Sequence, residues 1–247
     1  MTVEEKLLKE IEELKAELYK AQKAADENAR YKAFIENRVN RNAKDSVFLN
    51  LFSYPKYQMQ IYRELFPDDK DIKPEDLKLF RVDRILTNHP YNDLGLLARQ
   101  KLIVLAEAET EWSENIIYRL AVYYFQSMED FIYQTGMNVH NKAKINLLDV
   151  EAFVIYPGKR KIKKAVISLR DEFFNGDPRK PDFKAKIIYG DYKGGIIEEY
   201  ITFCRIFDKQ RSIHKDNLEP QKWIAATVDI CIKQNVLADY LKIIEWR

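Results

Sequence analysis

Glycine, cysteine and long apolar runs are all scarce in this sequence. Seven glycines among 247 residues favour helices and long strands over a loop-rich all-β fold. The two cysteines, Cys204 and Cys231, lie 27 residues apart and form no CxxC pair, which predicts inert, half-buried thiols in a reducing cytosol. No run approaches the roughly 20 apolar residues that cross a membrane, and the start lacks an apolar core of signal-peptide length. These absences predict a cytoplasmic protein without a membrane partner.

Several site chemistries are disfavoured because their motifs are missing. The three histidines, His89, His140 and His214, show neither HxxxH nor HxH spacing, so a zinc site is not expected. No P-loop, GxGxxG or GxSxG motif is present. The net charge of +2, from 41 basic and 39 acidic residues, does not by itself indicate a nucleic-acid binder. A local basic surface remains compatible with it, because phosphate affinity depends on where charges cluster.

The composition, with 46% hydrophobic and 32% charged residues, is that of a soluble globular protein. Residues 1–29 are expected to form a helical heptad arm, since positions 3–29 contain neither glycine nor proline. Its apolar residues recur every three or four positions, at Leu7, Ile11, Leu14, Leu18, Ala21 and Ala25. This spacing is typical of a coiled coil that would form a homodimer. An amphipathic helix packed on its own domain, or a partly frayed arm, fits the same pattern.

The remaining chain alternates strand and helix patterns and predicts an α/β core, a mixed sheet flanked by helices. A first helix carries Val47, Phe48, Leu51 and Phe52, and the strongest helix pattern runs from Ser113, the predicted N-cap, to Gly136. Strands are expected in LKLFRVDRILTN, LGLLA, KLIVLAEAE, VEAFVIYPG and FKAKIIYGD. We predict a core over residues 30–195 and a helical region packed on it over residues 196–247.

Acidic residues flank two neighbouring apolar runs in the stretch YNDLGLLARQKLIVLAEAET. If a tight turn centres on Gln100, residues whose numbers sum to 200 face each other, which would place Asp93 opposite Glu107. Strand alternation would put Glu109 on the same side as Glu107. Three converging carboxylates repel one another unless a hard cation such as Mg²⁺ binds them. The alternative is that each is a solvated acid at a strand end.

Short motifs in and just after this stretch are similar to those of a known protein family. They are Asn92-Asp93-Leu94-Gly95, Glu107-Ala108-Glu109, Trp112-Ser113-Glu114-Asn115-Ile116 and Arg119. Together with KDSVFLNLFS upstream and FVIYPG, EEYITFCRIFDKQ and CIKQNVLADYL downstream, this segment resembles the PD-(D/E)XK nuclease family transposases, related to the Rpn recombination-promoting nucleases. The likeness covers about residues 40–244, and the heptad arm falls outside it.

The resemblance implies a restriction-endonuclease-like core, in the order α-β-β-β-α-β, that cuts DNA with Mg²⁺ or Mn²⁺. Asp93 and Glu107 match the two metal-binding acids of the family. Position 109 departs from it, because the superfamily has Lys there and this branch usually has Gln. Glu109 would then add a metal ligand or act as a base, or it would mark a relative that is catalytically silent and serves as a DNA-binding or protein-interaction module.

Other candidate residues have two interpretations each. Asp45 could add an acid from the first helix, or cap that helix. Arg119 could meet a phosphate or orient Glu107, or form a surface salt bridge. A run of five basic residues in six follows the strand VEAFVIY; it would contact DNA phosphates or form a solvated turn, and it consists of Lys159, Arg160, Lys161, Lys163 and Lys164.

Overall fold

The computed structural model describes residues 43–80, 94–107, 112–142, 144–158, 164–189, 191–213 and 220–244. The side chains at 43–46, 107 and 220–222 lie outside this description, as does the predicted heptad arm. The chain divides into two compact units, Met1–Ser46 and Val47–Arg247, and the contacts below belong to the second. Within the described ranges no helix combines the length and apolar character that crossing a membrane requires.

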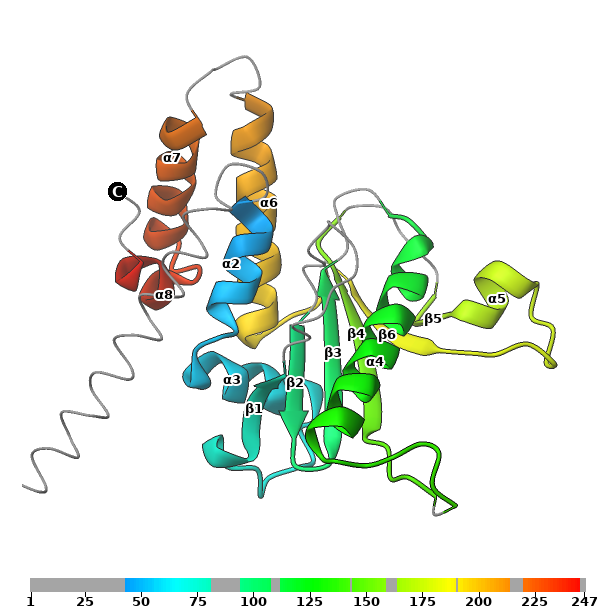
Figure 1. Cartoon of the computed structure of the whole chain (residues 1–247). Coiled ribbons are helices and arrows are strands. Elements are labelled where there is room, and N and C mark those ends of the chain that lie inside the picture. Colours follow the sequence, from blue (N-terminus) through cyan, green and yellow to red (C-terminus); the bar gives the residue numbers. More distant parts are fainter. Residues whose placement is uncertain are drawn as a thin grey trace, which may run out of the picture. The chain divides into compact units, whose positions relative to one another are not determined.

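A mixed sheet forms the centre of the second unit. Its six strands, in the described part of the chain, have the order β1-β2-β3-β4-β6-β5 (Figure 1). The strands are β1 (Leu77–Phe80), β2 (Leu94–Ala98), β3 (Lys101–Glu107), β4 (Asp149–Tyr156), β5 (Val166–Ser168) and β6 (Lys184–Tyr189). β1, β2 and β3 form an antiparallel meander, β4 runs parallel to β3 and β6, and β5 is antiparallel to β6. The predicted α/β class, a mixed sheet flanked by helices, is confirmed.

Helices precede, interrupt and follow these strands. They are α2 (Ala43–Leu51), α3 (Pro55–Leu65), the 3₁₀ helix η1 (Pro74–Asp76), α4 (Asn115–Gln134), α5 (Leu169–Phe174), α6 (Gly195–Ile213), α7 (Pro220–Lys233) and α8 (Ala238–Ile243). α3 starts at Pro55, because proline is tolerated in the first helical turn, where its missing N–H has no intrahelical partner. The helix that we predicted around Val47 is α2, and the predicted C-terminal helices are also present. Because α2 already begins at Ala43, Asp45 lies within its first turn and is not its N-cap.

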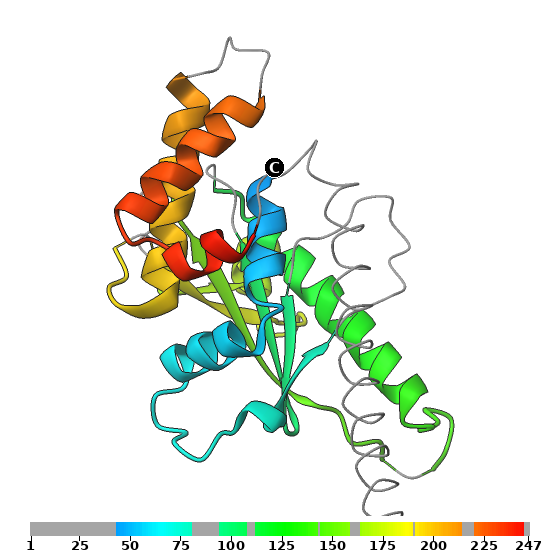
Figure 2. The ribbon, with the colours of Figure 1, turned by 90° about the vertical axis from the view of Figure 1, so that its left-hand side faces the viewer.

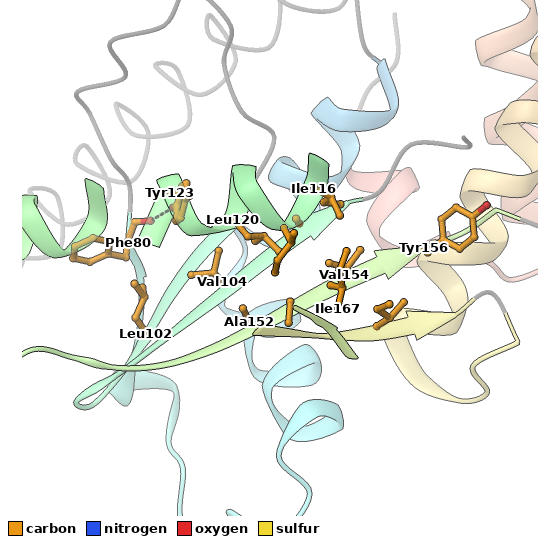
Figure 3. Packing of buried hydrophobic residues seen from close by; sticks show 14 of the residues in the cluster. Phe80, Leu102, Val104, Ile116, Leu120, Tyr123, Ala152, Val154, Tyr156 and Ile167 are labelled. Atoms are coloured by element: carbon orange, nitrogen blue, oxygen red, sulfur yellow. Dashed lines mark hydrogen bonds between the residues drawn. The ribbon is translucent and has the colours of Figure 1, made fainter. Parts of the chain in front are cut away.

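One face of the sheet packs against α4. Leu102, Val104 and Ala106 of β3 alternate toward this helix and meet Ile116 and Leu120 in a buried cluster (Figure 3). These side chains are at most 6% exposed. Apolar residues recur at every second position along β3 and at every third or fourth position along α4. Each element therefore turns one apolar side toward the other. The crossover from β3 through α4 to β4 therefore forms the centre of the core.

The opposite face of the sheet lies against α3 and α6 (Figures 1 and 2). Phe66, just after α3, meets Phe153 of β4 with ring centroids 5.8 Å apart. The ring centroids of Phe48 in α2 and Tyr200 in α6 are 5.2 Å apart, so these two helices share one aromatic cluster. β3 is buried on both faces as a result, since its residues from Leu102 to Ala106 are fully inaccessible to solvent.

The segment between β4 and β6 contains elements that we did not predict. β5 is a three-residue edge strand, and α5 follows it directly. The hydroxyl of Ser168 accepts a hydrogen bond from the amide of Asp171 at 3.2 Å and donates one to Asp182 at 2.7 Å. These bonds satisfy the start of α5. Such a short strand and helix carry too few residues to show a period in sequence.

Both cysteines are completely buried rather than half-buried. Cys204 of α6 and Cys231 of α7 are 0% exposed, and neither forms a disulfide. Burial raises the pKa of Cys231 to about 12. A thiol with this pKa stays protonated near neutral pH, which makes it a poor nucleophile.

A carboxylate links α3 to the start of α6. Glu64 accepts hydrogen bonds from the amides of Ile196 and Ile197, the latter at 3.2 Å. These amides belong to the first turn of α6, where N–H groups lack intrahelical partners and favour negative charge. Burial raises the pKa of Glu64, the two amide hydrogen bonds lower it in part, and the charge of Glu199 raises it further. The net effect is that the pKa of Glu64 is raised.

This raised pKa predicts a specific pH dependence of stability. The folded protein binds the Glu64 proton more tightly than the unfolded chain does, so the free energy of unfolding should fall as pH rises from about 4.5 through the folded pKa. In Glu64→Gln this contribution is absent. We expect urea denaturation to show that wild type loses stability relative to Glu64→Gln over this window, with a constant difference at higher pH. Parallel curves at every pH would contradict the burial of this carboxyl.

Candidate functional site

Glu107 ends β3 at the edge of the sheet where three strands finish together. β3, β4 and β6 are parallel neighbours, so their carboxyl ends meet at one edge. Glu107 pairs with Ile155 of β4, and Tyr156 pairs with Tyr189 of β6. Ala106 is 0% exposed, so β3 is buried at least up to the residue before Glu107. Glu107 is the last residue of β3, at the edge where the three strands finish.

The predicted register of the β2–β3 hairpin is wrong by one residue. Leu94 pairs with Leu105 and Ala98 with Lys101, so paired numbers sum to 199 and not to 200. The turn has two residues, and Arg99 adopts a φ of 55°, which is typical of two-residue hairpins. The opposition of Asp93 and Glu107 does not follow from this register. Their closeness stays a prediction.

Contacts with the segment before β1 hold this tight turn. The amide of Arg99 donates to the carbonyl of Asp76 at 3.2 Å, and its guanidinium donates to the carbonyl of Asp71 at 3.0 Å. The same guanidinium lies 3.3 Å from the Asp76 carboxylate. These bonds stabilise a left-handed φ that costs a non-glycine residue about 1 kcal/mol or more. A register set by such distant contacts could not be derived from the hairpin sequence.

The predicted acids themselves are not described by the structure. Asp93 and Glu109 lie outside the described residues, and the side chains of Glu107 and Asp45 lie outside the described side chains. Among the side chains that are described, no group of three or more His, Cys, Asp or Glu is placed to hold a metal ion. The predicted metal site depends on these four residues, so it stays a prediction.

Aromatic and backbone contacts build the described part of this sheet edge. The ring of Trp112, between β3 and α4, meets the ring of Tyr156 edge-on at 5.3 Å. A Cβ at Gly158 would overlap the Tyr156 ring, so glycine permits the chain to turn closely over it. Nε of Arg205 in α6 donates to the carbonyl of Pro157 at 3.4 Å. Arg205 lies in the segment EEYITFCRIFDKQ of the family likeness, but its 98-residue separation from Glu107 gave no reason to single it out.

The start of α4 follows the WSEN motif and begins later than predicted. Asn115 is its first residue, and Glu114 rather than Ser113 occupies the N-cap position. The hydroxyl of Ser113 nevertheless accepts from the Asn115 amide at 3.3 Å, and the indole of Trp112 donates to Glu114 at 3.2 Å. The motif therefore ties the loop after β3 to the first turn of α4.

Of the residues predicted to contact DNA, the structure describes Arg119 and Lys164. Arg119, in the first half of α4, is partly buried and interacts with other protein groups, so both of its interpretations stay open. Lys164 donates to the carboxylate of Glu172, and this hydrogen bond raises the pKa of Lys164. The other basic residues of the run lie outside the described residues: Lys159, Arg160, Lys161 and Lys163. A phosphate would therefore compete with the Glu172 carboxylate for Lys164.

Comparisons with protein-family models, with curated proteins and with solved structures found no match.

Proposed function

We propose that the protein is a divalent-metal-dependent DNA endonuclease with a restriction-endonuclease-like core. The observation that carries the proposal is the order of the described elements, in which the helices α2 and α3 and the short η1 precede the run β1-β2-β3-α4-β4. A helix followed by this run is the α-β-β-β-α-β order that the resemblance implies, with an antiparallel meander followed by a parallel crossover. The motif residues fall at the matching junctions, since Asp93 directly precedes β2 and Glu107 ends β3.

The start of β2 lies beside the end of β3, and this proximity, not an opposed pair of side chains, supports a shared metal site for the two acids. Leu94, the first residue of β2, pairs with Leu105, two residues before Glu107. Asp93 is bonded to Leu94, so its Cα lies about 3.8 Å from that of Leu94. Carboxylate oxygens are the ligands that Mg²⁺ and Mn²⁺ prefer, and Glu109 or Asp45 would add further oxygens. A metal held there would polarise a phosphate oxygen and make bound water a better nucleophile.

Basic groups near the same edge would hold the DNA. The run Lys159–Lys164 follows the carboxyl end of β4, the strand next to Glu107. Its charges would contribute affinity for phosphates that does not depend on sequence and that weakens with salt. Arg119 would contact a phosphate or orient Glu107 from α4. Trp112 and Tyr156, which pack against each other, would keep the loop after β3 in place.

A catalytically silent relative is the second candidate, and Glu109 favours it. A lysine at this position orients water and stabilises developing negative charge, whereas a glutamate does neither in that way. Such a protein would bind DNA, or another protein, without cutting. Glu109→Lys separates the two candidates: a silent relative would gain metal-dependent cleavage, whereas in an active enzyme cleavage is already present in wild type.

Metal binding gives the most direct test, because it does not require turnover. At a Mn²⁺ concentration of 100 Kd, one site that exists in the folded state alone adds about 2.7 kcal/mol to the free energy of unfolding. We expect Mn²⁺ to raise the melting temperature of wild type by several degrees and that of Asp93→Ala much less. In parallel, supercoiled plasmid should be nicked by wild type with Mg²⁺ or Mn²⁺ and left intact with EDTA.

Three outcomes separate the alternatives. Equal Mn²⁺ shifts in wild type and Asp93→Ala would refute the metal site. A shift confined to wild type without nicking would support the silent relative. Nicking that persists in EDTA would show that the cleavage does not depend on the proposed site.

A further inference from the structure

Aromatic side chains are exposed along the outer side of α4. Tyr118 is 58%, Phe125 66% and Tyr133 74% exposed. The other side of the helix packs on the sheet through buried residues that include Ile116, Leu120 and Tyr123 (Figure 3). α4 is thus apolar on two sides, although the sheet occupies one of them.

The three exposed aromatics lie on one stripe with the exposed Glu129 and the half-buried Val122. Tyr118, Val122, Phe125, Glu129 and Tyr133 are spaced by four, three, four and four residues. At about 100° per residue, these five positions fall within an arc of about 80° on the helix. This is the spacing with which one helix packs along another. Glu129 is the single charged member, so the stripe offers little to a strongly charged partner.

We propose that this stripe, Tyr118 to Tyr133, is a two-fold interface through which two copies of the chain pair their α4 helices antiparallel. The positions are symmetric about a midpoint between residues 125 and 126. An antiparallel copy therefore places Tyr118 against Tyr133 of its partner, Val122 against Glu129, and Phe125 beside the axis. A self-complementary patch is what a two-fold interface requires, and two-fold dimers are the commonest oligomers.

The exposed area is of the right order. Aromatic side chains bury roughly 150–250 Å² each, so the exposed parts of the three rings offer roughly 300–500 Å². A standard interface takes about 800 Å² from each partner. The aromatics would supply about half of that area, and the rest of the helix face and its flanks would supply the remainder. Tyrosines and phenylalanines near the centre of an interface also carry most of its binding energy.

This inference does not depend on the proposed nuclease activity, because its readout is the oligomeric state. We expect the 247-residue chain to sediment as a dimer at tens of micromolar. Phe125→Glu should weaken dimerisation about 30-fold or more, because it places two carboxylates next to the axis. Phe173→Glu alters an exposed phenylalanine of α5, 44% exposed, and should leave the dimer intact. Circular dichroism would check that both variants are folded.

A charge swap tests the antiparallel geometry itself. Tyr118→Glu alone should weaken the dimer, whereas Tyr118→Glu combined with Tyr133→Lys should restore it, because the new charges meet twice across the axis. The two positions are 15 residues apart on one helix, too far to pair within a chain.

Competing modes of association have distinct results. Leu14→Glu interrupts the heptad pattern of residues 3–29 and should not affect an α4 dimer. Dissociation by Leu14→Glu with no effect of Phe125→Glu would overturn the proposal in favour of the arm. A wild-type protein that stays monomeric over the same concentrations would overturn it as well.

Discussion

Glu107→Ala is expected to reduce metal-dependent DNA cleavage by about 1000-fold or more. A factor of 1000 corresponds to about 4 kcal/mol of transition-state stabilisation, and a bound metal ion supplies several kcal/mol at a phosphoryl oxygen. Glu107 is the last residue of β3, and its truncation to alanine would remove a proposed metal ligand. The measurement is the initial rate of plasmid nicking over a range of Mg²⁺ concentrations.

The matched control lies at the other end of the same strand pair. Asp149, the first residue of β4, is 72% exposed in its side chain and lies 3.9 Å from Lys101. Asp149→Ala removes a carboxylate of similar size far from the proposed metal and should change the rate by less than about twofold. Glu107→Gln keeps the volume of the side chain and should be nearly as inactive as Glu107→Ala. Full activity in Glu107→Gln would mean that this carboxylate holds no metal.

Gly95→Ala is expected to lower the free energy of unfolding by about 3 kcal/mol. A Cβ at Gly95 would lie 2.5 Å from the carbonyl oxygen of Phe80 and 2.5 Å from the hydroxyl of Tyr123. That hydroxyl donates to the same carbonyl at 3.1 Å, so the methyl group would separate β1 from β2 and break a buried hydrogen bond (Figure 3). The melting temperature should fall by about 6–12 °C.

A double-mutant cycle with Tyr123→Phe identifies the cause. In wild type, Tyr123→Phe leaves the Phe80 carbonyl without this donor and should cost about 1 kcal/mol or more. In Gly95→Ala that bond is already displaced, so the second substitution should cost much less. Additive losses of stability in urea denaturation would show that Gly95 and Tyr123 do not share this contact. The result would also explain the glycine of the NDLG motif by packing, without reference to catalysis.

The regular elements were the most predictable part of the fold. β2, β3, β4, β6 and α4 lie where apolar periodicity placed them, because each must turn an apolar set toward the same core. Their ends were less predictable, as the start of α4 shows. Ser113 and Glu114 are both polar residues before an apolar run, so the sequence pattern alone does not decide which of them caps the helix.

The hairpin register shows where local reasoning fails. The residues Arg99-Gln100-Lys101 allow a turn of two or three residues, and nothing within the hairpin chooses between them. Hydrogen bonds from Arg99 to Asp71 and Asp76 favour the two-residue turn. Those partners come from more than 20 residues earlier in the chain, so their effect is tertiary. The shift by one residue affected the argument for the acid pair, although it changed no strand assignment.

The sequence by itself determined the α/β class, the acids that flank β2 and β3, and the motifs on which the nuclease proposal depends. Tertiary structure decided the strand order, the hairpin register, the burial of both cysteines and which side of α4 stays open to solvent. Periodicity reports whether a segment has an apolar side, because that depends on neighbours along the chain. Which surface covers that side depends on residues far away in sequence. α4 illustrates the difference: its sequence carries apolar residues on two sides, and only the position of the sheet shows that Tyr118, Phe125 and Tyr133 remain exposed.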